Sequence, residues 1–431
     1  MSAAGPPADA ADDDAAACAG LRAQGNGIAI VGAGIGGLSA ALACAAAGLE
    51  VRVFEQAAAL DEVGAGLQLG SNATRVLQRL GVLDALLAVA VRPSEVRLRT
   101  AVRGRLVATR PLGAASERRY GAPYLHVHRA DLQQVLAEAV QARGIPLALD
   151  HRLTGLRQDD EGVDLGFVTA SGAARSTRAG LCIGADGLQS RVRAALFGAE
   201  PPRFTGNVAW RATIPLSTTL PAAQREPVVT VWMGDGAHLV QYLVRGGRCM
   251  NIVAVFEDPT WTHERWHDRG DANALRARFA GWHPEVGALL AQVSECHLWA
   301  LCDRVPMPAW RGGRCTLLGD ACHPMLPFLA QGAAMAIEDA WTLAHCLSAA
   351  TVAKASVQDP GRLDAYEHAR RKRTARVQSE ARSQARLFHL AQPAAAMRNL
   401  VLGLGSRLFP QAALARYDWL YGHDVTAPGT K

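Results

Sequence analysis

Short apolar runs alternate with helical periodicity near the start of the chain. Residues 28–31 form an apolar run that ends in glycines, a helical pattern covers about residues 36–47, and a second apolar run covers residues 51–54. Short apolar runs bounded by turn residues are typical of buried strands, and apolar spacings of three and four residues are typical of helices. The order strand, turn, helix, strand predicts the opening of a parallel α/β sheet.

Both kinds of pattern continue along the rest of the chain. Residues 204–256 alternate between apolar and polar positions and contain turn signals such as Gly246-Gly247, which predicts a second, antiparallel sheet. Residues 95–109 predict a β-hairpin. Further helices are expected at about residues 72–80, 83–89, 131–143, 332–348 and 362–390, and further strands at residues 152–157, 163–168, 174–184 and 315–318.

These elements predict an α/β protein with two interwoven domains. A doubly wound cofactor domain is expected from discontinuous segments, and an antiparallel-sheet substrate domain is expected to be inserted between them. The cofactor domain is assigned residues 26–95, 120–200 and 300–355, the substrate domain residues 96–119 and 201–299, and the C-terminal helices and tail residues 356–431. Residues 1–25 are rich in Ala, Gly, Pro and Asp and are expected to be a disordered extension.

Composition narrows the class of protein. Apolar residues make up 49% of the chain and charged residues 19%, which is ordinary for a globular protein. We expect no membrane span, because the chain has no uncharged apolar run long enough. The net charge of +6 is modest and slightly favours small anionic ligands over nucleic acid. The 9 Cys are odd in number and contain no CxxC pair, so we expect reduced thiols and a cytoplasmic protein.

The glycines after the first apolar run form the pattern G-x-G-x-x-G at Gly32, Gly34 and Gly37. The first permits a tight turn, the second lets backbone approach a pyrophosphate, and the third lets the helix pack on the strand. A pyrophosphate would then lie at the N-terminus of the helix. Glu55 ends the second strand, where its carboxylate can accept hydrogen bonds from ribose hydroxyls. NAD and FAD are bound by the same loop, so the loop alone leaves the dinucleotide open.

Two further motifs carry a resemblance to a known family. Residues 184–193 read GADGLQSRVR and residues 318–324 read LGDACHP, and both follow the glycine loop in order. Residues 62–72, EVGAGLQLGSN, resemble a further segment of that family. With this set the chain resembles the class A flavoprotein aromatic hydroxylases from about residue 28 to residue 424. Within the class, the likeness is greatest to the salicylate, 3-hydroxybenzoate and 6-hydroxynicotinate hydroxylases.

The resemblance implies FAD as the cofactor and assigns several residues to it. Asp320 is expected to accept hydrogen bonds from ribityl or ribose hydroxyls, although a helix cap or an Asx-turn would also explain an aspartate there. Asp186 and Gly187 are expected near FAD and the incoming nicotinamide, although Asp-Gly is also a common turn. Arg129 resembles the family arginine near the FAD phosphates, with a solvated arginine as the alternative.

A helix is expected to begin at about Gly332 and Ala333, and their N–H groups can face the pyrimidine edge of the flavin. The positive end of the helix dipole there would stabilise an anionic reduced flavin. The chain has a single dinucleotide fingerprint, so the resemblance implies that NADH or NADPH docks transiently. In the family, reduced FAD reacts with O2 to a C4a-hydroperoxide that attacks an electron-rich aromatic ring. Loss of CO2 accompanies this reaction where attack occurs at the carbon that bears the carboxylate.

The substrate site is expected on the apparent strand HLVQY. His238 and Tyr242 are four positions apart, so both point to one face of a strand. By resemblance, His238 is the candidate base for the ring hydroxyl and Tyr242 a hydroxyl or carboxylate contact. A buried structural histidine is the alternative. Arg211 and Arg245 are candidate partners of a substrate carboxylate, with a structural role as the alternative for each. Pro327 stands where some 3-hydroxybenzoate hydroxylases carry Gln, which weakens that particular substrate.

Two other patterns could indicate other functions, and neither is expected to do so here. Residues 263–267 spell HExxH, with Glu285 downstream, but Pro and Gly bracket a short polar stretch, so we expect no metal site. The basic residues 370–386 predict a solvated helix face, with neither nucleic acid nor a membrane as partner. The predicted activity is NAD(P)H- and O2-dependent hydroxylation of a small hydroxylated aromatic acid. A same-fold monooxygenase acting on a larger polycyclic or alkene substrate, an NAD-binding dehydrogenase and a non-catalytic cofactor-binding module stay as alternatives. A homodimer is compatible with the sequence.

Overall fold

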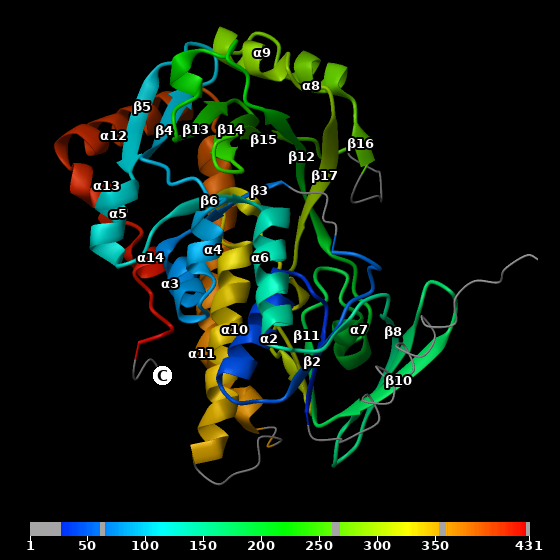
Figure 1. The fold of residues 1–431 in the computed structure, drawn as a ribbon. Coiled ribbons are helices and arrows are strands. Elements are labelled where there is room, and N and C mark those ends of the chain that lie inside the picture. The colour runs from blue at the N-terminus through cyan, green and yellow to red at the C-terminus, as the bar shows by residue number, and fades with distance from the viewer. Residues whose placement is uncertain (1–26, 61–64, 261–267, 353–358, 360, 428–431) are drawn as a thin grey trace, which may run out of the picture.

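The computed structural model describes residues 27–427 except 61–64, 261–267, 353–358 and 360 (Figure 1). The expected disordered extension at residues 1–25 and the HExxH stretch at residues 263–267 therefore lie outside the described residues. Within the described residues, no helix is long and apolar enough to cross a membrane.

The first sheet has six strands in the order β18-β19-β11-β1-β2-β7, and all its pairings are parallel except the one between β18 and β19. Its strands are β1 (Ile28–Val31), β2 (Val51–Phe54), β7 (Leu147–Ala148), β11 (Leu181–Gly184), β18 (Arg311–Gly312) and β19 (Cys315–Leu317). All residues of β1 are buried, as expected for a strand covered on both faces. The sequence predicted β1 and β2 at their observed bounds.

Helices cover this sheet and extend away from it (Figure 1). Helix α2 packs between the sheet and α10, and it also contacts α6. The helices near the first sheet are α2 (Ile35–Ala46), α3 (Ser71–Arg79), α4 (Leu83–Leu87), α6 (Arg129–Ala142), α7 (Arg191–Phe197), α10 (Gly332–Val352) and α11 (Gly361–Phe388). The predicted helices at 36–47, 72–80, 131–143, 332–348 and 362–390 correspond to α2, α3, α6, α10 and α11 within a few residues.

The prediction of one strand over residues 174–184 is wrong. Two strands lie there, β10 (Ala174–Ala179) and β11, and they belong to different sheets. The chain changes sheet at Gly180, whose N–H bonds to the carbonyl of Gly27. β10 completes a three-stranded antiparallel sheet with β8 (Arg152–Gln158) and β9 (Val163–Val168), and a separate pair is formed by β3 (Gly66–Leu69) and β6 (Leu125–His128).

A large sheet of eight strands forms the second half of the molecule. Its order is β16-β17-β12-β15-β14-β13-β4-β5, and its pairings are antiparallel except the parallel pairing of β13 with β4. Its strands are β4 (Glu95–Thr100), β5 (Leu106–Pro111), β12 (Arg203–Pro215), β13 (Val229–Gly234), β14 (Ala237–Val244), β15 (Cys249–Glu257), β16 (Asp268–Gly270) and β17 (Cys296–Asp303). The early hairpin of β4 and β5 thus joins this sheet through β4, in which Val96 pairs with Val229 of β13.

Different helices pack against one face and against one end of this sheet. One face packs against α8 (Ala272–Arg278) and α9 (Pro284–Leu290) around buried residues such as Trp210, Leu239 and Leu275. The C-terminal helices α12 (Ala394–Leu408) and α13 (Pro410–Ala415) contact β5 at one end of the sheet (Figure 1), and α14 (Asp418–Tyr421) contacts α3. The short helix α5 (Gly113–Tyr120) and the 3-10 turns η1 (Ala222–Gln224), η2 (Gly319–Ala321) and η3 (Pro327–Leu329) complete the described elements.

A buried ion-pair network joins α10 to α11. Arg370 is 1% exposed, and it donates to Glu338 at 2.6 Å and to Asp339 at 2.7 Å. Arg373 donates to the same Glu338 through two nitrogens at 2.7 Å. The prediction of a solvated basic face over residues 370–386 is therefore wrong for these arginines, because their charges are paired inside the protein. Burial alone would raise the pKa of Glu338, but the two arginines outweigh it and lower that pKa to about 2.

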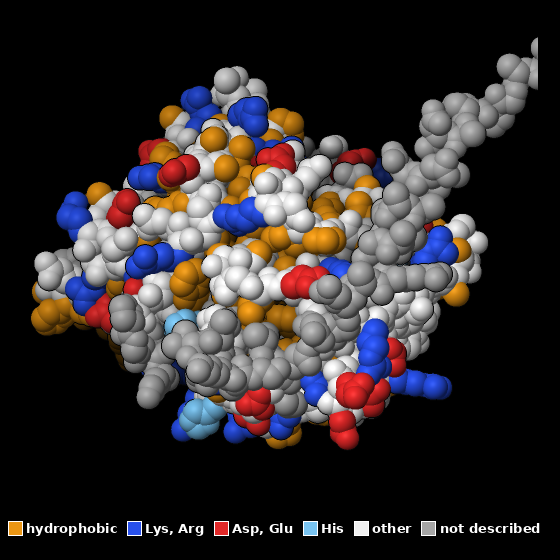
Figure 2. All heavy atoms as spheres, turned by 60° about the horizontal axis from the view of Figure 1, so that its bottom comes forward, with side chains coloured by type: hydrophobic (Ala, Val, Ile, Leu, Met, Phe, Trp, Pro, Cys, Tyr) orange, Lys and Arg blue, Asp and Glu red, His pale blue; other side chains and the backbone are white. Residues whose placement is uncertain are grey.

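Charges of both signs are spread over the surface. Figure 2 shows one face on which Lys and Arg side chains alternate with Asp, Glu and hydrophobic side chains, and no single basic patch dominates the visible part of it. Several basic residues form surface pairs, for example Arg178 with Asp159 and Asp164, and Arg269 with Glu295.

Candidate functional site

A cavity of about 1700 Å³ lies where the two large sheets meet. Its walls come from the glycine loop after β1, the end of β2, the N-terminus of α10 and the inner face of the eight-stranded sheet. The helices α12 and α13 line its far end. A typical small-ligand pocket measures about 300–1,000 Å³, so this cavity has room for a dinucleotide and a further small molecule. We call it the central cavity.

The three glycines of the loop have different reasons to be glycine. Gly32 has a φ of +104°, and a Cβ there would lie 2.5 Å from the carbonyl oxygen of Ala185. A Cβ on Gly37 would lie 1.9 Å from the carbonyl oxygen of Gly32. These two glycines are required by packing of the loop itself. A Cβ on Gly34 would meet nothing within 4 Å, and Gly34 lines the central cavity, so this position leaves open space for a ligand phosphate.

Glu55 orders the same loop. One of its carboxylate oxygens accepts the N–H of Ala33 at 2.7 Å, and the other accepts the N–H of Ala57 at 2.9 Å. Glu55 also lines the central cavity. A carboxylate can accept about four hydrogen bonds, so lone pairs remain for the hydroxyls of a bound ribose. Gln133 on α6 supports the loop from the other side by donating to the carbonyl of Ala33 at 3.0 Å, a contact that the sequence reading missed.

Asp320 and Arg129 lie on the wall near the start of α10. Both line the central cavity, and Asp320 is exposed there. A Cβ on Gly332 would lie 4.0 Å from an oxygen of Asp320, so this carboxylate lies beside the N-terminus of α10. The enclosing protein raises the pKa of Asp320, whereas His323 and Arg129 act to lower it. Asp320 lies within the 3-10 turn η2, and its contact with a cofactor, like that of Arg129, stays a prediction.

Asp186 has a structural duty that is visible in the fold. One carboxylate oxygen accepts the hydroxyl of Ser190 at 2.5 Å, and the other accepts the N–H groups of Arg191 at 2.7 Å and Val192 at 3.1 Å. It thereby caps the first turn of α7. Burial raises the pKa of Asp186, and these hydrogen bonds oppose the rise. Asp186 and Gly187, whose φ is +73°, also line the central cavity, so the turn leaves both residues facing the space where a cofactor contact is predicted.

The N-terminus of α10 opens into the central cavity through Gly332 and Ala333. The first N–H groups of a helix have no partner within the helix, and they lie at the positive end of its dipole. The turn before it is held by the side chain of Gln331, which accepts from Asn72 at 3.1 Å, and Asn72 in turn donates to Glu338 at 2.6 Å. The buried ion-pair network thus reaches the helix start that the resemblance assigns to the flavin.

His238 and Tyr242 both lie on β14 and both line the central cavity. The Nδ1 atom of His238 lies 2.7 Å from the Nε2 atom of His389. Burial, followed by the neighbouring His389, lowers the pKa of His238 well below its ordinary value, so the imidazole is neutral at neutral pH. Burial raises the pKa of Tyr242, and Arg211 opposes that rise. The ring centre of Tyr242 lies 4.6 Å from that of His126.

The two arginines considered for a substrate carboxylate have different surroundings. Arg211 lines the central cavity, and its guanidinium lies 5.0 Å from the ring centre of Trp299. Arg245 has a φ of +54° in the turn after β14, where it contacts His128 at 3.3 Å, and the central cavity does not include it. Arg245 is therefore no longer a candidate. Arg110 on β5 is a cavity arginine that the sequence reading missed, and it stacks 4.4 Å from the ring centre of Tyr417.

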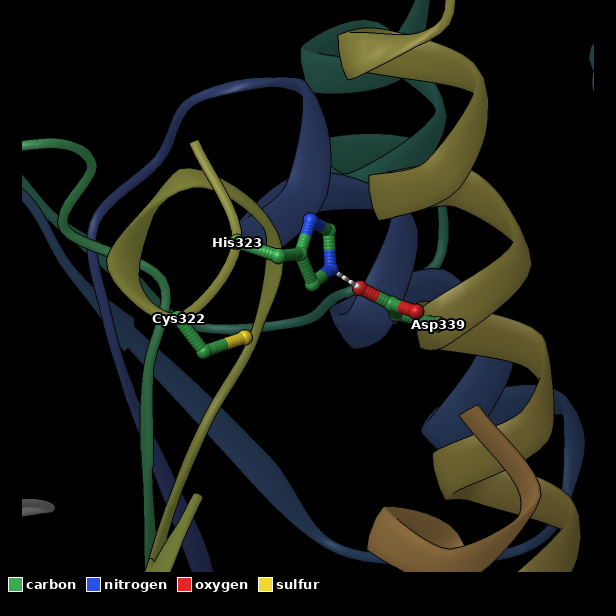
Figure 3. A group of neighbouring side chains, drawn as sticks. All are labelled: Cys322, His323 and Asp339. Carbon is green, nitrogen blue, oxygen red and sulfur yellow. Dashed lines mark hydrogen bonds and ion pairs between the residues drawn. The ribbon is translucent and has the colours of Figure 1, made fainter. Parts of the chain in front are cut away.

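One cluster in the described residues has the composition of a metal site (Figure 3). Cys322, His323 and Asp339 bring ligand atoms within 4.8 Å of one another. However, Asp339 already accepts from His323 at 2.5 Å through one oxygen and from Arg370 at 2.7 Å through the other. Burial raises the pKa of the Cys322 thiol well above its ordinary value, whereas a metal needs the thiolate. This cluster is better explained as part of the ion-pair network between α10 and α11.

The fold and the cavity define a dinucleotide-binding protein with a second, partly apolar compartment. Known proteins of this kind are similar to the chain in sequence and in structure. The FAD binding domain family matches residues 27–381. The 6-hydroxynicotinate 3-monooxygenase of Bordetella bronchiseptica is 40% identical over 357 residues, which cover 81% of this chain and 89% of that protein. A 3-amino-4-hydroxybenzoate 2-monooxygenase of Streptomyces platensis is 36% identical over 408 residues, which cover 94% and 98%.

A solved salicylate hydroxylase substrate complex has a TM-score of 0.75 and 27% sequence identity, and the match covers 92% of this chain and 95% of that one. The chain therefore belongs to the FAD binding domain family, and within it to the class A flavoprotein hydroxylases. The predicted mixed α/β fold, FAD as cofactor and an FAD-dependent monooxygenase as the kind of enzyme are confirmed. The residue roles are not tested by these similarities and stay predictions.

Proposed function

We propose that the protein hydroxylates a small hydroxylated aromatic acid, using FAD, NADH or NADPH, and O2. The observation that carries the proposal is that one cavity joins the glycine loop to a compartment lined by His238, Tyr242 and Arg211. Two relatives are named as enzymes that act on 6-hydroxynicotinate and on 3-amino-4-hydroxybenzoate, and these names support a substrate acid of this size. Bound FAD would supply the activation of O2. The residues of the chain bind and orient the substrate and move its proton.

In this proposal His238 accepts the proton of the ring hydroxyl. Its low pKa keeps the imidazole neutral, and Nδ1 is held by His389, which leaves Nε2 as the proton acceptor. A ring oxygen that has lost its proton makes the ring more electron-rich and a better target for hydroxylation. Tyr242 would donate to a hydroxyl or carboxylate oxygen, because burial keeps its own hydroxyl protonated. Arg211 would pair with the substrate carboxylate.

The cofactor half of the cavity receives FAD through the loop and the start of α10. Gly32, Gly34 and Gly37 shape the approach of the pyrophosphate, and Glu55 would hold the ribose. The remaining proposed contacts are Arg129, Asp186, Gly187, Asp320, Gly332 and Ala333. We infer a doubly wound FAD-binding domain around the six-stranded sheet, with the eight-stranded sheet as the inserted substrate domain. A cytoplasmic location and a homodimer are part of the same proposal.

The test is a comparison of His238→Gln with the control His368→Gln, in which the replaced histidine is exposed on α11. Both variants are expected to retain FAD. With salicylate, 3-hydroxybenzoate and 6-hydroxynicotinate as probes, His238→Gln should lower kcat by about a hundredfold or more, the usual range for loss of a general base. His368→Gln should stay within about twofold of the wild type. Equal kcat values in the two variants would remove the base role from His238.

A larger polycyclic or alkene substrate is the second candidate. The wall of the central cavity continues over apolar residues of the sheet and reaches Val401 and Phe409 at the C-terminal helices. This extension has the apolar character that a second ring needs. The same three acids distinguish the two candidate functions. If the wild-type enzyme leaves all three acids unchanged but its flavin is reduced faster with a polycyclic phenol, the second candidate function is supported.

A further inference from the structure

Three titratable side chains form a hydrogen-bonded chain from the central cavity to the protein surface. The Nδ1 atom of His238 lies 2.7 Å from Nε2 of His389, and Nδ1 of His389 lies 2.9 Å from Oε1 of Glu257. His238 is 2% exposed and His389 is 6% exposed, whereas the side chain of Glu257 is 54% exposed. This row of three side chains therefore begins at the wall of the cavity, crosses the protein interior and ends in solvent.

Three separate segments bring these side chains together. His238 lies on β14, Glu257 ends β15, and His389 directly follows the last residue of α11. The backbone fixes the arrangement, because the carbonyl of His389 accepts the N–H of Gly236 at 3.2 Å and the carbonyl of Gly236 accepts the N–H of Glu257 at 2.9 Å. The turn between β13 and β14 thus ties the end of α11 to the end of β15.

The carboxylate of Glu257 at the outer end sets the direction of every hydrogen bond. Because it only accepts, Nδ1 of His389 must carry a hydrogen. In the neutral imidazole Nε2 of His389 is then an acceptor, so Nδ1 of His238 must carry a hydrogen. Nε2 of His238 is left with a free lone pair. Glu257 thereby selects, from the surface, the tautomer of His238 that can take a proton from a substrate.

The surroundings of the chain are apolar. The rings of Phe328 from η3 and Phe388 from α11 lie on His238, each with its ring centre 5.2 Å away. Among the described residues, the titratable group that acts on His238 is His389, and the one that acts on His389 is Glu257. Burial lowers the pKa of His389, and Glu257 opposes that change. Apolar packing of this kind excludes water, so the two imidazoles provide a path for a proton that water does not.

We propose that His389 and Glu257 form a proton relay that carries the hydroxyl proton of the substrate from His238 to solvent. The substrate hydroxyl gives its proton to Nε2 of His238, and the hydrogen on Nδ1 of His238 passes to Nε2 of His389. The hydrogen on Nδ1 of His389 passes to Glu257, which releases it to water. One proton leaves the substrate oxygen and one enters solvent, and no electrons are transferred. The relay rests on the proposed function, since it needs a hydroxylated substrate at His238.

The experiment measures proton release when the oxidised holoenzyme binds salicylate, 3-hydroxybenzoate or 6-hydroxynicotinate in weakly buffered solution with a pH-indicator dye. The variants are Glu257→Gln, in which the amide oxygen can still accept from His389 but takes no proton, and His389→Gln. Glu295→Gln is the matched control, because it removes a surface carboxylate of the same sheet region that pairs with Arg269. Steady-state product formation and FAD content are measured on the same preparations.

The wild type and Glu295→Gln should release one proton per acid bound in a fast phase. We expect the rate of that phase to fall about a hundredfold in His389→Gln, the lower end of the range for acid–base effects, and by less, about tenfold, in Glu257→Gln. The double variant should be no slower than His389→Gln, because the relay is already cut there. The affinity for the acid and the FAD content should change little in these variants. A general packing defect would lower both.

The outcomes separate the two proposals. If the wild type hydroxylates an acid but Glu257→Gln and His389→Gln release protons at the wild-type rate, the relay is overturned and the proposed function stands. If both variants slow proton release only in parallel with loss of FAD or of affinity, the relay is also overturned. If the wild type hydroxylates none of the acids, the proposed function fails and the relay fails with it.

Discussion

Removal of the Arg370 guanidinium is expected to destabilise the protein strongly. Arg370→Met keeps much of the side-chain volume but deletes the ion pairs to Glu338 at 2.6 Å and to Asp339 at 2.7 Å. The two carboxylates are 0% exposed, so water cannot replace the lost partner. Breaking a buried pair of this kind costs about 3–5 kcal/mol. Arg373 still holds Glu338 and His323 still holds Asp339, so we expect about 3 kcal/mol.

The assay is urea unfolding of the holoenzyme, followed by tryptophan and flavin fluorescence, with Arg371→Met as the control. Arg371 is the next residue on α11, is 44% exposed, and pairs with Glu367 across one turn of the helix. Surface pairs of this kind contribute about 0–1 kcal/mol, so the control should lie close to the wild type. A loss of less than about 1 kcal/mol in Arg370→Met would refute the view that the network depends on this charge.

Three further predictions concern the glycine loop, the substrate compartment and the buried ion-pair network. Gly37→Ala should abolish FAD retention, measured as the flavin-to-protein absorbance ratio, because its Cβ would lie 1.9 Å from the Gly32 oxygen; an intact ratio would contradict the role of the close approach. Arg211→Met should raise the KM for the acid by about 10–100-fold, as expected for a lost charged hydrogen bond, while Arg245→Met should not, and equal KM values would contradict the assignment. Glu338 has a folded pKa of about 2 against an ordinary 4.5, so it stabilises the fold above about pH 4.5, and this contribution should be lost as pH falls towards 2; an acid-unfolding midpoint that stays unchanged in Glu338→Gln would contradict this.

Local patterns predicted much of the fold. The strands at residues 28–31 and 51–54 and the helix that follows Gly34 were predictable because a buried parallel strand is uniformly apolar and the loop between them needs glycine at fixed positions. The division of residues 174–184 into two strands was not predictable in the same way. Both strands there are extended, and only their partners in space differ, so no local pattern marks the change at Gly180.

The parts of the site that depend on long-range contacts were missed. Arg110 meets Tyr417, and His238 meets His389, and in each case the partners are far apart in the sequence. His389 lies at the end of a helix whose basic stretch had indicated only a solvated surface. The burial of Arg370 was missed for the same reason, because its acidic partners lie on the preceding helix and an arginine has no local pattern that distinguishes a buried pair from a solvated one.

The central claim is that the enzyme inserts one atom of O2 into a small hydroxylated aromatic acid. The most direct test is turnover of the purified yellow protein under 18O2 with NADH or NADPH and a panel of hydroxybenzoates and hydroxynicotinates, with the products analysed by mass spectrometry. We predict that one acid accelerates NAD(P)H oxidation and that its product carries one 18O atom. NAD(P)H oxidation that yields only peroxide, or a product whose added oxygen comes from water, would contradict it.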